Sequence, residues 1–582
     1  MEIKIKEGII LNYIDKYKSW LKEDYFDKDT KEELLSIKDN AKEIEDRFYT
    51  DLSFGTAGLR GKIGAGTNRM NKYTVSLATQ GLADTIAGFG EEAKKMGVAI
   101  AYDVRHYSKD FAAEASLVLA ANGIKVYLFE DIAPTPELSF AIRRLKTLSG
   151  IVITASHNPK DYNGYKVYWK EGSQILDNIA EKILKNIKAI KSFKDIKTMS
   201  KEEALGKGLL NIIGKEAEDE YIENVLRLSL NDNIDKNINI IYTPLNGTGN
   251  RPVREVLKER EFKNIFVVPE QENPDPDFTT VGYPNPENPK VFDYAQKLGK
   301  EVDGDILIAT DPDCDRVACM VKNKEGEYVF LNGNQTGALL VNYILSSRSR
   351  KNTIPQNGVI VKSIVTGDLS RRISEKYNVE TIETLTGFKH ICSKANEFDI
   401  TKEHTFIFGF EESIGYVYGT MVRDKDGVIS SMLISEMAAY YKKEGKTLLD
   451  VLEELYREFG YYKEKLISIV LEGLEGKERF ESIMKEIREN PITQIGDKKL
   501  IMTMDYLNGE IKDLEKGTVE ETHMPKSNVL KYKFDDGSWY AIRPSGTEPK
   551  IKIYIYSTGK SENHSNENIS LIEKKIMDRI KK

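Results

Sequence analysis

The apolar runs VAIAY (98–102), KVYLF (125–129) and GIVI (150–153) decide the fold. Each run has the length of a buried strand, and stretches of helical periodicity at 108–122 and 136–145 separate them. Strands that alternate with helices in the order β-α-β-α-β are typical of a parallel sheet covered by helices. The sequence therefore predicts an α/β domain in this part of the chain.

The same order of strands and helices occurs twice more. Strands are expected at 238–242, 265–268 and 305–309, and again at 359–362, 379–382 and 404–408. We therefore expect three tandem α/β domains with mixed, mostly parallel sheets of related topology. Their expected bounds are 1–210, 211–325 and 326–455.

The C-terminal stretch has a different pattern. A hairpin is expected at 529–542 around the turn Asp535-Asp536-Gly537, followed by a strand at 551–556 and a helix at 569–580. The polar run SENHSNEN (561–568) is expected to form an exposed loop. These elements predict a smaller α+β domain at 456–582.

Length and charge narrow the class of protein. The 582 residues exceed a single hydrophobic core, which rarely grows beyond about 250–300 residues. Lys and Arg number 85 and Asp and Glu 92, so the formal net charge is −7. This mild acidity argues against a nucleic-acid-binding protein. No run of about 18 uncharged apolar residues occurs, so no transmembrane helix and no membrane partner are predicted.

The N-terminus and the cysteines predict a cytoplasmic location. Residues 1–26 lack the apolar core of a signal peptide and have the spacing of an amphipathic helix. The residues at that spacing are Ile10, Ile14, Tyr17 and Leu21. An odd, sparse set of cysteines does not make a disulfide framework and fits a reducing compartment. The three cysteines are Cys314, Cys319 and Cys392.

An acidic loop, DPDCDR (311–316), directly follows the strand expected at 305–309. It places Asp311, Asp313 and Asp315 at every second position, and carboxylates this close repel one another unless a cation lies among them. Oxygen ligands suit Mg²⁺. An EF-hand calcium loop would need glycine at its sixth position, where this sequence has Arg316. The loop therefore predicts a Mg²⁺ site, and the competing interpretation is an acidic surface turn.

A second polar loop, TASHNP (154–159), follows the strand expected at 150–153. Ser156 is a candidate nucleophile with His157 as its partner; alternatively, both serve local hydrogen bonds in an Asn-Pro turn. A serine hydrolase is disfavoured because no G-x-S-x-G motif is present. Ligands lie beyond the carboxyl ends of the strands in open parallel sheets, so we expect this loop and the acidic loop to meet in one cleft.

Three further loops have two interpretations each. RPSGT (543–547) is either a phosphate cradle or a polar turn. Glu411-Glu412-Ser413 either binds sugar hydroxyls or is simply solvated. FGTAGLRG (54–61) either brings Arg60 to an anion or forms a turn, and it does not match a Walker A motif.

Taken in order, FGTAGLRG, TASHNP, DPDCDR, TGFK, FEES and RPSGT resemble the motifs of the α-D-phosphohexomutase family, most of all those of its bacterial branch acting on glucose phosphates. The resemblance runs from Phe54 to Tyr556. It implies a four-domain, heart-shaped enzyme with one deep cleft. The implied enzyme is an intramolecular phosphotransferase, an isomerase of glucose 1-phosphate and glucose 6-phosphate. It acts through a phosphoserine, one Mg²⁺ per chain, and glucose 1,6-bisphosphate as intermediate and activator.

The resemblance also implies a role for individual residues. The implied metal ligands are an oxygen of the phosphorylated Ser156 and the carboxylates of Asp311, Asp313 and Asp315. The implied acid, base and charge-stabilising groups are Arg60, Lys166 of NGYK and Lys389 of TGFK. The groups implied to line the centre are His157 and Arg316. The implied sugar-binding residues are Glu411 and Ser413. The residues implied to bind the phosphate that is not reacting are Arg543, Ser545, Gly546 and Thr547.

The sequence departs from the family pattern in places and leaves alternatives open. Lys160-Asp161 stand where many relatives carry Gly-Gly, while Glu411-Glu412-Ser413 favours glucose over mannose or aminosugar phosphates. Alternatives of the same chemistry are a phosphopentomutase, a phosphomannomutase and a glucose 1,6-bisphosphate synthase. Alternatives of another class are a non-catalytic sugar-phosphate or metal-binding protein and a plain Mg²⁺ phosphatase. The partner expected is a small sugar phosphate, and the oligomeric state, monomer or dimer, is left open.

Overall fold

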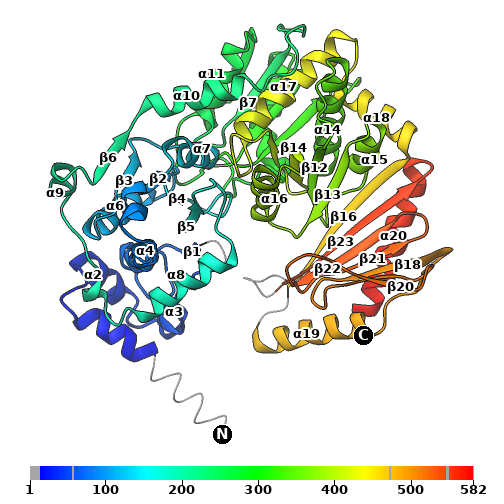
Figure 1. Cartoon of the computed structure of the whole chain (residues 1–582). Coiled ribbons are helices and arrows are strands. Elements are labelled where there is room, and N and C mark those ends of the chain that lie inside the picture. The colour runs from blue at the N-terminus through cyan, green and yellow to red at the C-terminus, as the bar shows by residue number, and fades with distance from the viewer. Residues whose placement is uncertain (1–12, 56–57, 471–472, 545–549, 581–582) are drawn as a thin grey trace.

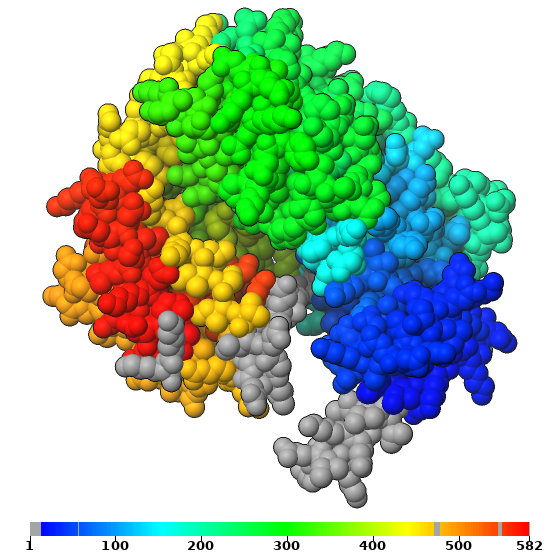
Figure 2. Space-filling model, turned by 180° about the vertical axis from the view of Figure 1, so that it is seen from behind, coloured from blue at the N-terminus to red at the C-terminus, as the bar shows by residue number. Residues whose placement is uncertain are grey.

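The computed structural model describes residues 13–55, 58–470, 473–544 and 550–580, without the side chains of 473–477. Four sheets divide the chain into four domains, as expected. The domains follow one another along an arc, so that the first and the last face each other (Figure 1). Seen from behind, the surface is hollowed between the blue first domain and the yellow-to-red last domain (Figure 2).

Domain I is built on a six-stranded sheet in the order β1-β5-β4-β2-β3-β6. Its strands are β1 (Gly58–Lys62), β2 (Val98–Tyr102), β3 (Val126–Phe129), β4 (Ser149–Ile153), β5 (Tyr162–Trp169) and β6 (Leu210–Ile213). Its helices are α4 (Lys72–Ala87), α5 (Glu91–Met96), α6 (Ser108–Ala121), α7 (Thr135–Leu145), α8 (Asp177–Ala189) and α9 (Lys201–Gly206). Alternate residues of β2 point to opposite faces, so Ile100 packs in the core with α4, α6 and α8, and Ala101 in the core with α7. Helices thus cover both faces of the sheet.

Domains II and III repeat this plan. The strands of domain II are β7 (Asn239–Thr243), β8 (Asn264–Val267), β9 (Ile306–Thr310), β10 (Val317–Lys322) and β11 (Tyr328–Leu331). Those of domain III are β12 (Gly358–Ser363), β13 (Glu380–Thr384), β14 (Thr405–Glu411) and β15 (Gly415–Tyr418). Their main helices are α10 (Lys215–Leu226), α11 (Asn250–Glu259), α12 (Pro269–Glu272), α13 (Asp293–Glu301), α14 (Gly333–Arg350), α15 (Leu369–Lys376), α16 (Phe388–Thr401), α17 (Gly427–Lys443) and α18 (Leu448–Phe459). The second sheet extends past residue 325, and one continuous hydrophobic core joins the two domains.

The three α/β domains share one feature that places the site. In each, the third strand of the β-α-β-α-β unit turns back into an antiparallel strand: β4 into β5, β9 into β10, and β14 into β15. The returning strands were not predicted, and they make the sheets mixed. Each connecting loop contains one non-glycine residue with left-handed backbone, namely Ser156 (φ 51°), Cys314 (φ 52°) and Ile414 (φ 55°). The loop that contains Ser156, the acidic loop and the loop that contains Glu412 and Ser413, called the sugar loop below, are therefore topological equivalents.

Domain IV is an antiparallel sheet in the order β16-β23-β22-β21-β18-β19-β20, with β17 paired to β18. Its strands are β16 (Tyr461–Val470), β17 (Gln494–Ile495), β18 (Lys498–Asp505), β19 (Glu510–Asp513), β20 (Thr518–Glu521), β21 (Leu530–Phe534), β22 (Trp539–Pro544) and β23 (Lys550–Gly559). Its helices are α19 (Gly473–Glu489) and α20 (Glu562–Ile580). The hairpin predicted around Asp535-Asp536-Gly537 is confirmed as β21 and β22.

The loop predicted for the polar run 561–568 is wrong, because α20 already begins at Glu562. Two residues of this run are buried and bonded to the preceding strand, Asn568 through its side chain and Ser565 through its backbone carbonyl. Asn568 Nδ2 donates to Thr558 O (2.7 Å), and Ser565 O accepts from Ser557 Oγ (2.8 Å). The polar composition of the run does not reveal these bonds between the helix and the preceding strand.

The N-terminal segment packs on domain I. Residues 13–22 are helical, as predicted for this part of the segment, and α2 (Lys28–Ser36) and α3 (Ala41–Phe48) follow. Trp20 lies at the centre of an aromatic cluster with Phe26, Phe48 and Tyr73. The three cysteines are free and buried. Among the described helices, none is both long and apolar enough to cross a membrane.

Candidate active site

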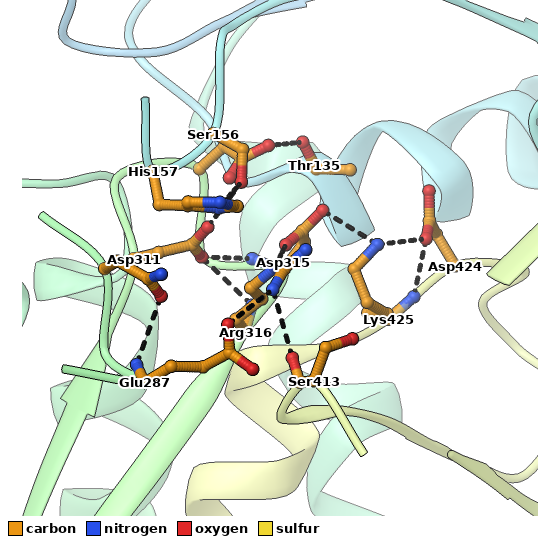
Figure 3. Close-up of polar contacts among 12 residues, drawn as sticks. Thr135, Ser156, His157, Glu287, Asp311, Asp315, Arg316, Ser413, Asp424 and Lys425 are labelled. Carbon is orange, nitrogen blue, oxygen red and sulfur yellow. Dashed lines mark hydrogen bonds and ion pairs between the residues drawn. The ribbon is translucent and has the colours of Figure 1, made fainter. Parts of the chain in front are cut away.

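Ser156 lies where domain I meets domain II. Its side chain is almost wholly buried, and its Oγ donates to Asp311 Oδ2 (2.7 Å) and lies 3.1 Å from His157 Nδ1 (Figure 3). A left-handed backbone is unfavourable for a residue with a Cβ and is kept only where the surroundings enforce it. The Ser156 hydroxyl is thus presented to the acidic loop of the next domain by a constrained turn.

The three aspartates of the acidic loop form a buried cluster. Carboxylate oxygens of Asp311, Asp313 and Asp315 all lie within 4.8 Å of one another. Asp311 Oδ1 accepts from the backbone N–H groups of Asp315 (3.1 Å) and Arg316 (3.0 Å), which folds the loop around its first carboxylate. Oδ1 of Asp313 and Oδ1 of Asp315 are buried without a hydrogen-bond partner among the described residues. Buried carboxylate oxygens without partners are costly, so they suit a bound cation.

Three cations surround the cluster. Lys166 Nζ lies 2.8 Å from Asp313 Oδ2, and Lys425 Nζ lies 3.0 Å from Asp315 Oδ2. The third is Arg316, whose Nε lies 3.8 Å from Asp315 Oδ1 (Figure 3). These three positive charges balance the three buried carboxylates. A metal cation and a phosphate could therefore bind together without leaving a large net charge in the site.

The pKa values of the cluster follow from burial and from these neighbours. Burial, together with the charges of Asp313 and Asp315, raises the pKa of Asp311 well above its usual value. Burial alone would raise the pKa of Asp313 as well, but the charge of Lys166 holds it below its usual value. Burial and the charge of Arg316 lower the pKa of His157 well below its usual value. The lowered pKa favours the neutral form of the imidazole beside Ser156 Oγ at pH 7.

All four domains line one pocket of about 540 Å³ beside this cluster. Domain I contributes His157, and domain II contributes Arg316 and Glu287. Domain III contributes Glu411 and Ser413, and domain IV contributes Arg543, Lys550 and Lys552. The shared cleft that was expected from the loops at the strand ends is thus present.

The sugar loop is fixed by its backbone contacts. Glu411 is buried, and its Oε1 accepts from Gly387 N (2.7 Å), whereas Ser413 O accepts from Arg316 Nη1 (3.1 Å). The carboxylate of Glu412 turns into domain III, where it accepts from Thr366 Oγ1 (2.9 Å). Burial and the charge of Glu411 raise the pKa of Glu412 to about 7.

Family models match the chain in four consecutive parts. They describe phosphoglucomutase/phosphomannomutase α/β/α domain I at residues 51–194, domain II at 219–326 and domain III at 332–459, and the C-terminal domain at 497–566. The chain belongs to the phosphoglucomutase/phosphomannomutase family. The match confirms the resemblance drawn from the motifs, and it makes the chain an isomerase of the intramolecular phosphotransferase type.

Individual proteins of this family are similar to the chain over most of its length. A phosphoglucomutase of Staphylococcus aureus is 40% identical over 516 residues, covering 88% of this chain and 91% of the relative. One of Staphylococcus epidermidis is 37% identical over 546 residues, covering 94% and 96%. The crystal structure of parafusin, a Paramecium phosphoglucomutase in an open form, shares the fold with a TM-score of 0.67 at 18% identity, covering 91% and 96%.

Not every residue implied by the phosphohexomutase pattern meets at the cluster. Arg60 Nη1 donates to Asn158 Oδ1 (3.5 Å) in the Ser156 loop. Lys389 Nζ pairs with Asp177 Oδ1 (3.0 Å) at the start of α8, which ties domain III to domain I. Ser545, Gly546 and Thr547 lie outside the described residues.

Three residues that bind the acidic cluster or the loop of Ser156 were not predicted from the sequence. Lys425 reaches Asp315 from the segment before α17, and Gly415 makes this possible because a Cβ there would lie 2.2 Å from Lys425 Cδ. Thr135, at the start of α7, donates to Asp313 Oδ2 (2.9 Å). Arg105 binds the Ser156 loop from within domain I. The signal for Lys425 was the charged run Arg423-Asp424-Lys425-Asp426, which is unusual in a buried segment.

Proposed function

We propose that the protein is a phosphoglucomutase that interconverts glucose 1-phosphate and glucose 6-phosphate through a phosphorylated Ser156 and glucose 1,6-bisphosphate. The observation that carries this proposal is the placement of Ser156 Oγ 2.7 Å from Asp311, beside a pocket lined by all four domains. A binding protein needs no nucleophile at such a cluster, and a phosphatase needs no distal wall. A coupled assay with glucose 1-phosphate, with and without the bisphosphate, tests the proposal directly.

In the forward reaction, the O6 hydroxyl of glucose 1-phosphate attacks the phosphorus of phosphorylated Ser156. The bond from phosphorus to Ser156 Oγ breaks, and the proton released by O6 ends on Oγ. His157 Nδ1, which is neutral and 3.1 Å from Oγ, suits the transfer of this proton. The bisphosphate then turns over, so that its 1-phosphoryl group passes back to Ser156 and glucose 6-phosphate leaves.

The cluster suits the charge that phosphoryl transfer concentrates on oxygen. Burial alone would lower the pKa of Lys166, but Asp313 and Asp315 raise it above the usual value, so Lys166 stays protonated and neutralises charge. The unpartnered oxygens of Asp313 and Asp315, together with Asp311, fit Mg²⁺. Bound Mg²⁺ supplies positive charge next to the transferring oxygens.

The domain IV wall of the pocket suits the phosphate that is not reacting. Arg543 lies opposite Lys552 in the β22–β23 pairing, with Lys550 close by in the same wall. Burial and the charge of Lys550 lower the pKa of Lys552. Three basic side chains that line one wall of the pocket suit an anionic ligand such as a phosphate.

We expect Arg543→Ala to lower kcat/KM for glucose 1-phosphate by about one to two orders of magnitude, because charged hydrogen bonds contribute roughly 1.5–3 kcal/mol. The variant should also depend more on added glucose 1,6-bisphosphate, since the intermediate escapes more readily. Steady-state rates over a bisphosphate titration measure both effects. The control is Lys574→Ala on the exposed face of α20, which should match the wild type. Wild-type behaviour of Arg543→Ala would remove this wall from the substrate site.

We expect glucose 1-phosphate to be preferred over mannose 1-phosphate by at least about tenfold in kcat/KM. The two sugars differ only at C2, and Glu411, whose carboxylate is held by Gly387 N, is the residue proposed to bind sugar hydroxyls. Parallel assays of both sugars measure the ratio. Glu411→Gln keeps the shape of the side chain and loses its charge, so it should reduce the ratio of kcat/KM between the two sugars. A ratio near one in the wild type would instead favour a mannose-active or dual-specificity enzyme.

A further inference from the structure

The Ser156 loop, defined here as residues 156–162, is held by a single guanidinium. Arg105 has a fully buried side chain and donates to the carbonyl oxygens of four loop residues. Its Nη1 donates to Pro159 O (2.8 Å) and Tyr162 O (3.1 Å), and its Nη2 to Ser156 O and Asn158 O. Asp103 fixes the guanidinium in turn, with Oδ2 3.4 Å from Nε. Arg105 thus binds the backbone on both sides of the turn in which Ser156 has its left-handed conformation.

Domain II covers the guanidinium of Arg105. The ring of Phe278 lies with its centroid 5.0 Å from Arg105 Cζ, and Phe278 is fully buried. An aromatic face attracts a cation most strongly where water is excluded. Phe278 itself is in a left-handed conformation (φ 46°). Its carbonyl oxygen accepts from Val281 N (3.0 Å) and Gly282 N (2.7 Å), which closes the turn behind the ring.

The same part of domain II meets the Ser156 loop at its outer side. Asp277 Oδ1 lies 3.0 Å from Lys160 Nζ and 3.3 Å from His106 Nε2. The ring of Tyr283 lies edge-on to His157 at 6.0 Å. The Asp277 pairs are largely exposed and contribute little, because water and salt screen them. Apart from the bond between Ser156 and Asp311, the contact between Phe278 and Arg105 is therefore the buried contact through which this part of domain II can fix the loop.

We propose that Phe278 is a positioning residue for Ser156, acting through Arg105 to lock the Ser156 loop of domain I to the domain that carries the acidic loop. This inference rests on the proposed function. Phosphoryl transfer requires a fixed distance and orientation between Ser156 Oγ and the acidic cluster. A displacement of about 1 Å can cost roughly 100-fold in rate. Among the described residues, Phe278 has no hydrogen bond or ring contact with either group, and it acts on their relative position because it packs against the guanidinium that binds the loop.

The test compares Phe278→Leu with Phe262→Leu. Both residues are buried in domain II and both lie under a cation, but the cation over Phe262 is Lys236, which is not part of the Ser156 loop and does not bind it among the described residues. We expect both variants to lose thermal stability. Phe278→Leu alone should lower kcat, and the rate at which unphosphorylated enzyme takes phosphate from glucose 1,6-bisphosphate, by roughly 10- to 100-fold. The KM for glucose 1-phosphate should stay within about twofold.

Arg105→Lys is the second variant of this test. It keeps the charge but loses the fork that reaches four carbonyl oxygens, so we expect a similar fall in kcat. Because the two residues act in series, the double variant should be little slower than either single variant. Additive losses, or equal kcat values for Phe278→Leu and Phe262→Leu, would overturn the proposal.

Hydrogen exchange of the peptide 155–163 gives a readout that needs no activity. Asn158 N and Tyr162 N are bonded within the loop, to Ala155 O (3.1 Å) and Pro159 O (3.1 Å). Phe278→Leu should speed their exchange at least about tenfold, and Phe262→Leu should not. Unchanged exchange in Phe278→Leu would refute the positioning role. A wild-type enzyme that takes no phosphate from the bisphosphate would refute the proposed function instead, and the exchange data would still decide the positioning role.

Discussion

Ser156→Ala is expected to lower mutase turnover by at least about three orders of magnitude. The variant loses the hydroxyl that donates to Asp311 and lies beside His157, and no other described hydroxyl occupies that position. Intact mass of the wild type should show one phosphate after incubation with glucose 1,6-bisphosphate, and the variant should show none. The hydroxyl contacts are worth about 1 kcal/mol each, so the melting temperature should fall by only a few degrees.

The matched control is Ser149→Ala at the start of β4, the strand that leads to Ser156. Ser149 is fully buried, and its Oγ donates to Tyr168 O (2.7 Å), away from the acidic cluster. We expect this variant to lose some stability and keep its phosphate and its turnover. Substantial turnover by Ser156→Ala would exclude a phosphoserine mechanism, whatever the result of the control.

Much of the fold was predictable because its signals are local. The strand at Val98–Tyr102 was predicted with its observed bounds, since both faces of this central strand are buried and the run is continuously apolar. The returning strand Tyr162–Trp169 was missed although six of its eight residues are buried, because polar residues such as Asn163 and Lys166 interrupt its apolar character. Lys166 is buried there only because Asp313 meets it from another domain.

The loops of the candidate site were predictable from the sequence, and the contacts between residues of different domains were not. Ser156 and Asp311 are 155 residues apart, and only the arc of domains brings them to hydrogen-bonding distance. Phe278 carried no recognisable motif in the sequence, and Lys425 carried only the charged run in which it lies. Their roles arise from contacts with Asp315 and Arg105, which depend on how domains II and III pack against the rest.

The proposed Mg²⁺ site at the three aspartates leads to the second prediction with a large expected effect. Asp313→Asn should lower kcat by about 10²–10³, because it removes one of three anionic ligands and leaves the oxygen charge of the transferring group less neutralised. The variant keeps the shape of the side chain and an oxygen that can accept from Thr135. Loss of rate therefore reports on charge more than on packing.

A thermal measurement separates metal binding from activity. A ligand present at about 100 times its Kd stabilises the folded state by about 2.7 kcal/mol, so Mg²⁺ should raise the melting temperature of EDTA-treated wild type. Asp313→Asn should lose most of that gain. The control is Asp424→Asn, a buried carboxylate that pairs with Lys425 but lies outside the three-aspartate cluster, and its gain from Mg²⁺ should persist. If EDTA changes neither the activity nor the melting temperature of the wild type, then Lys166, Lys425 and Arg316 alone balance the aspartates, and the cluster is an ion-pair network and not a metal site.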